Sequence, residues 1–273
     1  MYQVIKVLNN NGILAVNLEN GMECIFVGKG IGFHNREKTE FEALEGVKQY
    51  ALQEAKSTED SLSVINNVDP IYFDISNEII LAAEAKFGKI DTRIMLPLAD
   101  HISFAIERAK NDLSIQNPFT SDIKALFLEE YEVALKARAI IREYTGITIN
   151  DDEVGYITLH IHSALTSEHV SRTMSVTVLV SDMIDEIENK FNMKINKESL
   201  SYTRLMTHIK YMITRVLKKE ELKVDMSPYV KAEFPHAYQV AKELCAKLST
   251  ELNTTFSDIE IGYLAIHIER IRQ

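Results

Sequence analysis

The chain has 273 residues, of which 46% are hydrophobic and 26% charged, the composition of an ordinary soluble globular protein. There is no apolar run of about 18 residues and no signal-peptide pattern, so neither a membrane-spanning helix nor export is expected. A formal net charge of −10 argues against a protein that coats nucleic acid through a generally basic surface. The two cysteines, Cys24 and Cys245, fit a reducing cytoplasm and exclude a thiolate zinc site.

The first 35 residues predict a small antiparallel sheet. Short apolar stretches at residues 3–8, 13–17 and 23–27 are separated by turns that contain Asn11-Gly12 and Asn20-Gly21. Asn-Gly favours a two-residue hairpin loop, because both central residues of a type I′ turn have positive φ. A sheet of this size buries little apolar surface, so we expect it to dimerise or to pack on another part of the chain.

From about Phe41 the sequence pattern becomes helical. Residues 150–153 (NDDE) and 257–260 (SDIE) each resemble a capping box, in which the first side chain and the Glu three residues later satisfy free N–H groups. Apolar residues follow at helical spacing. We therefore expect all-α bundles, with polar links at residues 57–63 and 166–173.

The helical part contains an internal duplication built around histidine. Two pairs of histidines have the same 59-residue spacing, His101 with His160 and His208 with His267. A shift of 107 places residues 98–163 on 205–270 without a gap, and 19 of 66 positions are then identical. Unrelated segments would agree at roughly one position in sixteen. The predicted fold is a small antiparallel β-sheet domain followed by two all-α helical-bundle repeats, with domains at 1–58, 59–170 and 171–273.

Three interpretations of these histidines compete. Buried histidines often only hold helices together, but four at matched positions make that explanation weaker. A metal site is not favoured, because two histidines without Cys are a thin ligand set for zinc. His162 cannot join His160 on one ion, since residues i and i+2 of a helix point about 200° apart. The second copy also has Glu269 in place of His162.

Phosphoryl acceptance fits the pattern best, because a neutral imidazole is a good nucleophile near pH 7. The predicted phosphorylation sites are His101, His160, His208 and His267. Residues on the same helix faces are candidate partners of the phosphate, namely Arg108, Arg215, Tyr156 and Tyr263; for the arginines a merely solvated helix face is the alternative. Asp100 beside His101 is replaced by Thr207 beside His208, so no hydrolytic triad recurs. We expect neither catalytic residues nor a cofactor.

These residues resemble a known family. The motifs that resemble the phosphotransferase-system regulation domain (PRD) are residues 100–106 (DHISFAI) and 153–161 (EVGYITLHI), with 207–211 (THIKY) and 260–270 (EIGYLAIHIER) in the second copy. Residues 5–11 (IKVLNNN) and 28–33 (GKGIGF) resemble the co-antiterminator RNA-binding domain. The three domains together, in this order, resemble the BglG/SacY family of transcriptional antiterminators.

The resemblance implies a function. The N-terminal domain would form a homodimer and bind a leader mRNA hairpin of a sugar-utilisation operon, so that the overlapping terminator cannot form. Positions that match the RNA-binding residues of the family are Asn11, Gly28, Lys29, Gly30 and Phe33; many members have Arg in place of Lys29. The sugar-specific permease of the phosphotransferase system would inhibit through the histidines of the first PRD. HPr would activate through those of the second.

The chemistry of the sheet domain alone supports RNA binding only in part. Residues 1–58 carry six basic and seven acidic side chains, so there is no basic patch. Phe33 fits either a base-stacking side chain or a core aromatic. The glycines at 28, 30 and 32 lack a P-loop pattern, because no helix is expected directly after them; a strand edge or bulge with close backbone approach explains them better. The alternative function is a protein-binding regulator whose sheet only dimerises.

Overall fold

The computed structural model of the protein describes residues 1–42, 46–52 and 65–272. Contacts divide the chain into two compact units, Met1–Asn117 with Glu129–Thr173 and Pro118–Leu128 with Met174–Gln273. This division differs from the three predicted domains, because residues 118–128 belong to the second unit; the predicted boundaries stay a prediction. No helix within the described ranges is both long and apolar enough to cross a membrane.

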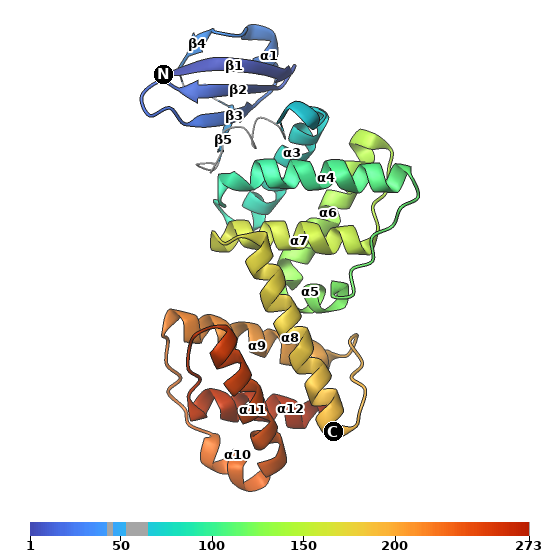
Figure 1. Ribbon diagram of the computed structural model, residues 1–273, viewed down its shortest axis with the longest axis vertical. Coiled ribbons are helices and arrows are strands. Elements are labelled where there is room, and N and C mark those ends of the chain that lie inside the picture. Colours follow the sequence, from blue (N-terminus) through green and yellow to red (C-terminus); the bar gives the residue numbers. More distant parts are fainter. Residues whose placement is uncertain (43–45, 53–64, 273) are drawn as a thin grey trace. The chain divides into compact units, whose positions relative to one another are not determined.

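The first unit begins with an antiparallel sheet in the order β4-β1-β2-β3-β5 (Figure 1). Its strands are β1 (Tyr2–Asn9), β2 (Gly12–Asn17), β3 (Glu23–Val27), β4 (Glu40–Phe41) and β5 (Lys48–Ala51). Alternate side chains of a strand point to opposite faces. Ile13 and Ala15 therefore pack with Phe26 in one cluster, whereas Leu14 and Ile25 join the core that the sheet shares with the helices of this unit. The expected packing of the small sheet on another part of the chain is confirmed.

The two hairpin turns differ from each other. In the second turn Gly21 has the expected positive φ (71°), but Asn20 does not, and residues 18–22 separate β2 from β3, so the expected two-residue type I′ loop is not formed. In the first turn the prediction was wrong, because Gly12 is already part of β2 and pairs with Asn9. The loop is closed by a side chain instead, since Asn9 Oδ1 accepts a hydrogen bond from the N–H of Asn11 (2.8 Å).

A short helix, α1 (Ile31–His34), follows the glycine-rich segment, so the expectation that no helix comes directly after it was wrong. Gly30 precedes α1 with φ 74°, a left-handed conformation that favours glycine. At Gly32 a Cβ atom would lie 1.9 Å from the carbonyl oxygen of Asn9. The predicted close backbone approach is thus present at Gly32, and it brings α1 against the first hairpin.

The helices of the first unit are α3 (Ile71–Phe87), the 3-10 helix η1 (Thr92–Ile94), α4 (Met95–Lys110), α6 (Leu128–Thr145) and α7 (Asp151–Thr166). Those of the second unit are α5 (Thr120–Leu126), most of α8 (Val170–Phe191), α9 (Leu200–Lys218), α10 (Ser227–Glu233), α11 (Pro235–Glu251) and α12 (Asp258–Arg272). The expected polar link at 57–63 lies outside the described residues. Of the expected link at 166–173, only Ser167–His169 separates two helices, because α8 already begins at Val170.

The two capping boxes form only in part. Asn150 Oδ1 accepts a hydrogen bond from the N–H of Glu153 (2.9 Å), and Ser257 Oγ accepts one from Glu260 (3.4 Å). The side chains of Glu153 and Glu260 do not turn back to the cap, however. They bind arginines on a neighbouring helix, which places them in the candidate site described below.

A buried carboxylate ties α5 to the rest of the second unit. Asp122 is fully buried and accepts hydrogen bonds from Ser181 Oγ (2.9 Å), Lys197 Nζ (2.8 Å) and the Tyr202 hydroxyl. A buried charge is tolerated only when it is paired and hydrogen-bonded, as this one is.

Candidate functional site

The first histidine pair joins α4 to α7. His101 on α4 and His160 on α7 have ring centroids 5.2 Å apart, and the ring of Tyr156 lies 5.8 Å from that of His101. The 59-residue spacing in the sequence therefore brings both histidines to one place. Burial lowers the pKa of His160 to about 3, so its ring is neutral at pH 7.

The second histidine pair repeats this arrangement on α9 and α12. The rings of His208 and His267 are stacked with centroids 4.3 Å apart, and Tyr263 lies 6.4 Å from His208. Burial lowers the pKa of His208 to about 3. It also lowers the pKa of His267, with further lowering by the charges of Arg270 and Arg204. Neutral imidazole is the form that can attack phosphorus.

An arginine–glutamate pair stands beside each pair of histidines. Arg108 on α4 donates Nε and Nη2 to the carboxylate of Glu153 on α7 (2.9 and 3.0 Å). Arg215 on α9 binds Glu260 on α12 in the same way (2.9 and 2.7 Å). Both arginines were predicted as phosphate partners, but in this structure each guanidinium is occupied by a carboxylate. A phosphate-binding role for these arginines stays a prediction, and it would require the phosphate to replace the carboxylate.

Glu153 also approaches the first histidine pair, with Oε2 3.3 Å from His101 Nε2. Burial raises the pKa of Glu153, but the neighbouring His101 and Arg108 outweigh burial and hold it below its usual value. The carboxylate is therefore ionised at neutral pH. From the sequence, both glutamates were expected only as helix-capping residues. Their identity in the two copies was the signal that could have indicated a further role in the site.

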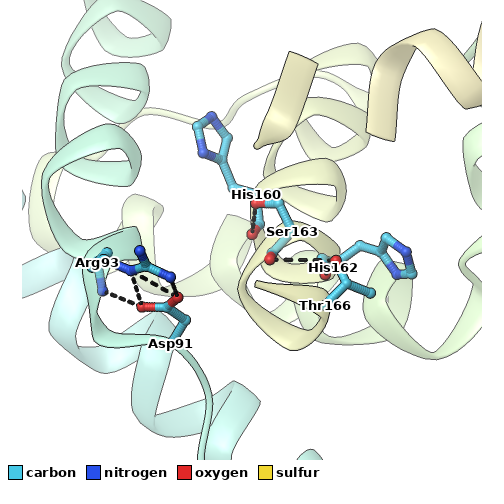
Figure 2. A network of polar contacts seen from close by, with 6 residues as sticks. All are labelled: Asp91, Arg93, His160, His162, Ser163 and Thr166. Atoms are coloured by element: carbon cyan, nitrogen blue, oxygen red, sulfur yellow. Dashed lines mark hydrogen bonds and ion pairs between the residues drawn. The ribbon is translucent and has the colours of Figure 1, made fainter. Parts of the chain in front are cut away.

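His162 lies apart from the pair, as expected because residues i and i+2 of a helix point about 200° apart. Figure 2 shows the rings of His160 and His162 leaving α7 in different directions. His162 Nδ1 is 2.8 Å from Glu130 Oε1 instead. Within the part of the chain that the structure describes, no three His, Cys, Asp or Glu side chains are grouped to hold a metal ion.

The residues predicted to bind RNA come together at one end of the sheet. The Asn11 side chain accepts a hydrogen bond from the N–H of Gly30 (3.1 Å), and the Asn11 carbonyl accepts one from Gly28 (2.8 Å). These contacts hold the segment from which Lys29 and Phe33 extend into solvent. Phe33 is 72% exposed, so the alternative that it is a core aromatic was wrong. An exposed phenyl ring next to a lysine can stack on a base and attract phosphate.

A contact that was not expected from the sequence connects this end of the sheet to α3. Asn9 Nδ2 donates to Asp74 Oδ2 (2.8 Å) and to the carbonyl of Pro70 (3.2 Å). Burial raises the pKa of Asp74, although hydrogen bonds from Asn9 and Asn11 partly oppose the shift. No periodicity predicts this contact, because the two segments are more than 60 residues apart.

Comparison with known proteins agrees with this division of roles. The CAT RNA binding domain family matches residues 2–59, and the PRD domain family matches residues 77–164 and 181–271. Among similar proteins are the PtsGHI operon antiterminator (33% identical, covering 99% of this chain and 97% of that protein) and transcription antiterminator LicT (28%, 98% and 98%), both of Bacillus subtilis. The crystal structure of GlcT CAT-PRDI matches with a TM-score of 0.53 and 34% identity, over 60% of this chain and 98% of that one.

A sheet with an exposed aromatic ring and lysine at one end, followed by two helical repeats with paired histidines, defines a phosphorylation-regulated nucleic-acid-binding class of protein. The matched domains, in this order and over nearly the whole chain, identify the family. The chain belongs to the transcriptional antiterminators that combine a CAT RNA-binding domain with two PRDs.

Proposed function

We propose that this protein is an antiterminator of a sugar-utilisation operon that binds a leader RNA hairpin as a homodimer and so prevents terminator formation. The exposed Lys29 and Phe33, held by the Asn11–Gly30 hydrogen bond, are the surface that binds the hairpin. This observation carries the proposal, because it supplies a stacking ring and a cation without a basic patch. The names of the relatives, which are operon antiterminators, support it.

The histidine pairs are the regulatory input in this proposal. A phosphorylated HPr or sugar-specific permease donates its phosphoryl group to the unprotonated ring nitrogen of a PRD histidine. The bond between phosphorus and the donor side chain breaks as the new P–N bond forms; the acceptor ring then loses the proton on its other nitrogen, and the donor side chain takes up a proton. His101 and His160 receive the inhibitory signal, and His208 and His267 the activating one. Each phosphate adds about −1.5 to −2 charges, which repel or attract the facing PRD of the dimer.

An RNA titration tests the first part. The full chain should bind a labelled leader hairpin, and Phe33→Ala should weaken binding by about fivefold or more, since base–aromatic stacking contributes about 1–3 kcal/mol. Leu18→Ala, which removes an exposed apolar side chain from the turn between β2 and β3, is the matched control and should bind normally. Absence of binding at low salt would favour the protein-binding regulator instead.

Intact-mass analysis tests the second part. The protein is incubated with phosphoenolpyruvate, enzyme I and HPr, with and without a permease. The experiment is then repeated with variants in which each histidine in turn is replaced by alanine. HPr alone should phosphorylate the second pair, and the permease should add phosphate to the first. An unchanged mass under all conditions would remove the regulatory part of the proposal.

A further inference from the structure

The second histidine pair opens into a pocket that contains a free arginine. The pocket has a volume of about 340 Å³ and is lined by His208, His267, Arg204, Thr203 and Thr207, among others. Arg204 precedes His208 by one helical turn on α9, so both side chains leave the same face of that helix. The pocket thus combines a phosphoryl acceptor with a guanidinium and two hydroxyl groups.

A second arginine stands beside the same acceptor. Arg270 follows His267 by three residues on α12, a spacing that makes the two side chains neighbours on the helix surface. Arg204 and Arg270 are both exposed, and neither forms a hydrogen bond or ion pair with any residue that the structure describes. Arg215 also lines the pocket, but Glu260 occupies it. Burial is the main cause of the lowered pKa of His267. The charges of Arg270 and Arg204 lower this pKa further, so both guanidinium groups act on the ring.

The first repeat lacks this arrangement. At the positions that correspond to Arg204, Arg270 and Thr207, it has Pro97, Ser163 and Asp100. The cavity beside His160, of about 90 Å³, does contain a guanidinium, that of Arg93. Asp91 binds this group through both carboxylate oxygens, as Figure 2 shows. Only the second copy therefore has uncommitted cations at a histidine pair among the residues described.

We propose that Arg204 and Arg270 form a phosphate-binding clamp for a phosphoryl group on His267, and that this clamp is particular to the second repeat. The inference rests on the proposed phosphorylation of the PRDs and adds which residues hold the product. Two guanidinium groups match the charge of about −2 on the phosphoryl group and present donors in a geometry that fits its oxygens. Thr203 and Thr207 supply further hydroxyl donors.

His267 is the acceptor in this proposal because of its surroundings. Nε2 of His208 is buried and has no hydrogen-bond partner in the described part of the chain. Arg270 lies on the same helix as His267 and one turn away from it. In the transfer, the unprotonated nitrogen of His267 forms the new P–N bond while the P–N bond of the donor breaks. The clamp stabilises the incoming phosphoryl oxygens and then the phosphohistidine.

Site-resolved mass spectrometry of the full chain tests the clamp with two donors. The first is phosphorylated HPr, and the second is phosphoramidate, a small molecule that needs no docking surface and whose leaving group, once its P–N bond breaks, is ammonia. The variants are Arg204→Gln, Arg270→Gln, the double variant and the double lysine variant. Lys218→Gln is the matched control, because it removes one positive charge from the exposed end of α9 at a residue that does not line the pocket. Circular dichroism confirms that each variant is folded.

The double glutamine variant should phosphorylate His267 at least about tenfold more slowly with both donors, and the phosphohistidine should hydrolyse faster, because charge-assisted hydrogen bonds are lost. The double lysine variant should recover part of the rate, and Lys218→Gln should match the wild type. Wild-type rates in the double glutamine variant with both donors would overturn the clamp. A loss with HPr alone would overturn it too, since the arginines would then serve donor docking. If the wild type accepts no phosphate from HPr, the proposed function fails; the phosphoramidate series still decides the clamp.

Discussion

Asp74 at the start of α3 stabilises the turn that carries the RNA-binding surface. Its Oδ2 atom accepts a hydrogen bond from Asn9 Nδ2 at 2.8 Å, and Asn9 Oδ1 in turn accepts one from the N–H of Asn11. The Asn11 side chain then accepts from Gly30. A continuous series of hydrogen bonds thus runs from the first PRD to the segment that presents Lys29, so a change at Asp74 should affect RNA binding.

The substitution Asp74→Ala should reduce both stability and RNA affinity. A hydrogen bond to a charged group contributes about 1.5–3 kcal/mol, and part of this is offset because burial disfavours the ionised Asp74, as its raised pKa indicates. We expect the free energy of unfolding to fall by about 1–2 kcal/mol. If all of that loss acts on the turn, RNA binding weakens by up to about 30-fold, since each 1.4 kcal/mol corresponds to a factor of about ten.

The substitution Asp74→Asn should be tolerated. Because the pKa of Asp74 is raised in the folded state, ionisation is less favourable there than in the unfolded chain. The carboxyl group therefore favours folding below its unfolded pKa, and this contribution is lost as the pH rises through the folded pKa. Asparagine carries no charge and keeps an oxygen that accepts from Asn9. At pH 7 this variant should be at least as stable as the wild type and should bind RNA normally.

Glu84→Ala is the matched control for these variants. Glu84 also lies on α3 and binds the sheet, through Lys48 Nζ at 2.5 Å, but this contact is to β5 and not to the Asn9 turn. The Glu84→Ala substitution should lower the free energy of unfolding without changing RNA affinity. Urea unfolding and titration of a labelled leader hairpin measure both quantities. Normal RNA binding by a destabilised Asp74→Ala protein would refute the reasoning, as would equal losses of affinity in the Asp74 and Glu84 variants.

Three further predictions concern the helical repeats. Arg215→Gln leaves the buried carboxylate of Glu260 without its partner and should lower the free energy of unfolding by about 3 kcal/mol or more, measured in urea. Asp122→Ala should destabilise the second unit by a similar 3–5 kcal/mol, because it leaves a lysine ammonium group unpaired; a wild-type unfolding midpoint would contradict this. His160, with a folded pKa of about 3, should make stability fall by up to about 1.4 kcal/mol per pH unit as the pH drops below about 6.5, and His160→Gln should reduce that slope.

The parts of the structure that depend on local pattern could be predicted from the sequence. The apolar stretch at residues 13–17 predicted a strand, and the capping residues Asn150 and Ser257 marked where α7 and α12 begin. The duplication indicated that the histidines occupy matched positions on matched helices of the two copies, whereas the contact between the two rings of each copy is seen only in the structure. None of these predictions required knowledge of a distant contact.

The parts that could not be predicted are contacts between polar side chains far apart in the chain. Glu153 matched a helix cap as well as an ion pair, and only packing of α7 on α4 decides that its carboxylate goes to Arg108. The burial of Asp122 follows from the position of α5 against α9, and no local pattern in the sequence indicates it. Hydrophobic periodicity indicates which face is buried, but it carries no information about which charge lies opposite.

The two copies share the ion pairs that hold their helices together and differ in the charges around their histidines. The Arg–Glu pairs, Arg108–Glu153 and Arg215–Glu260, are 45 residues apart in both copies and join the same two helices that carry the histidines. Because each pair is partly buried and bidentate, it fixes the relative positions of those helices, and with them the distance between the two rings. A group that the folded bundle needs in both copies cannot distinguish their signals. The difference in signal that we propose therefore depends on where the copies differ in charge around a shared acceptor geometry, and Arg204 with Arg270 is the difference that a phosphoryl group would contact most directly.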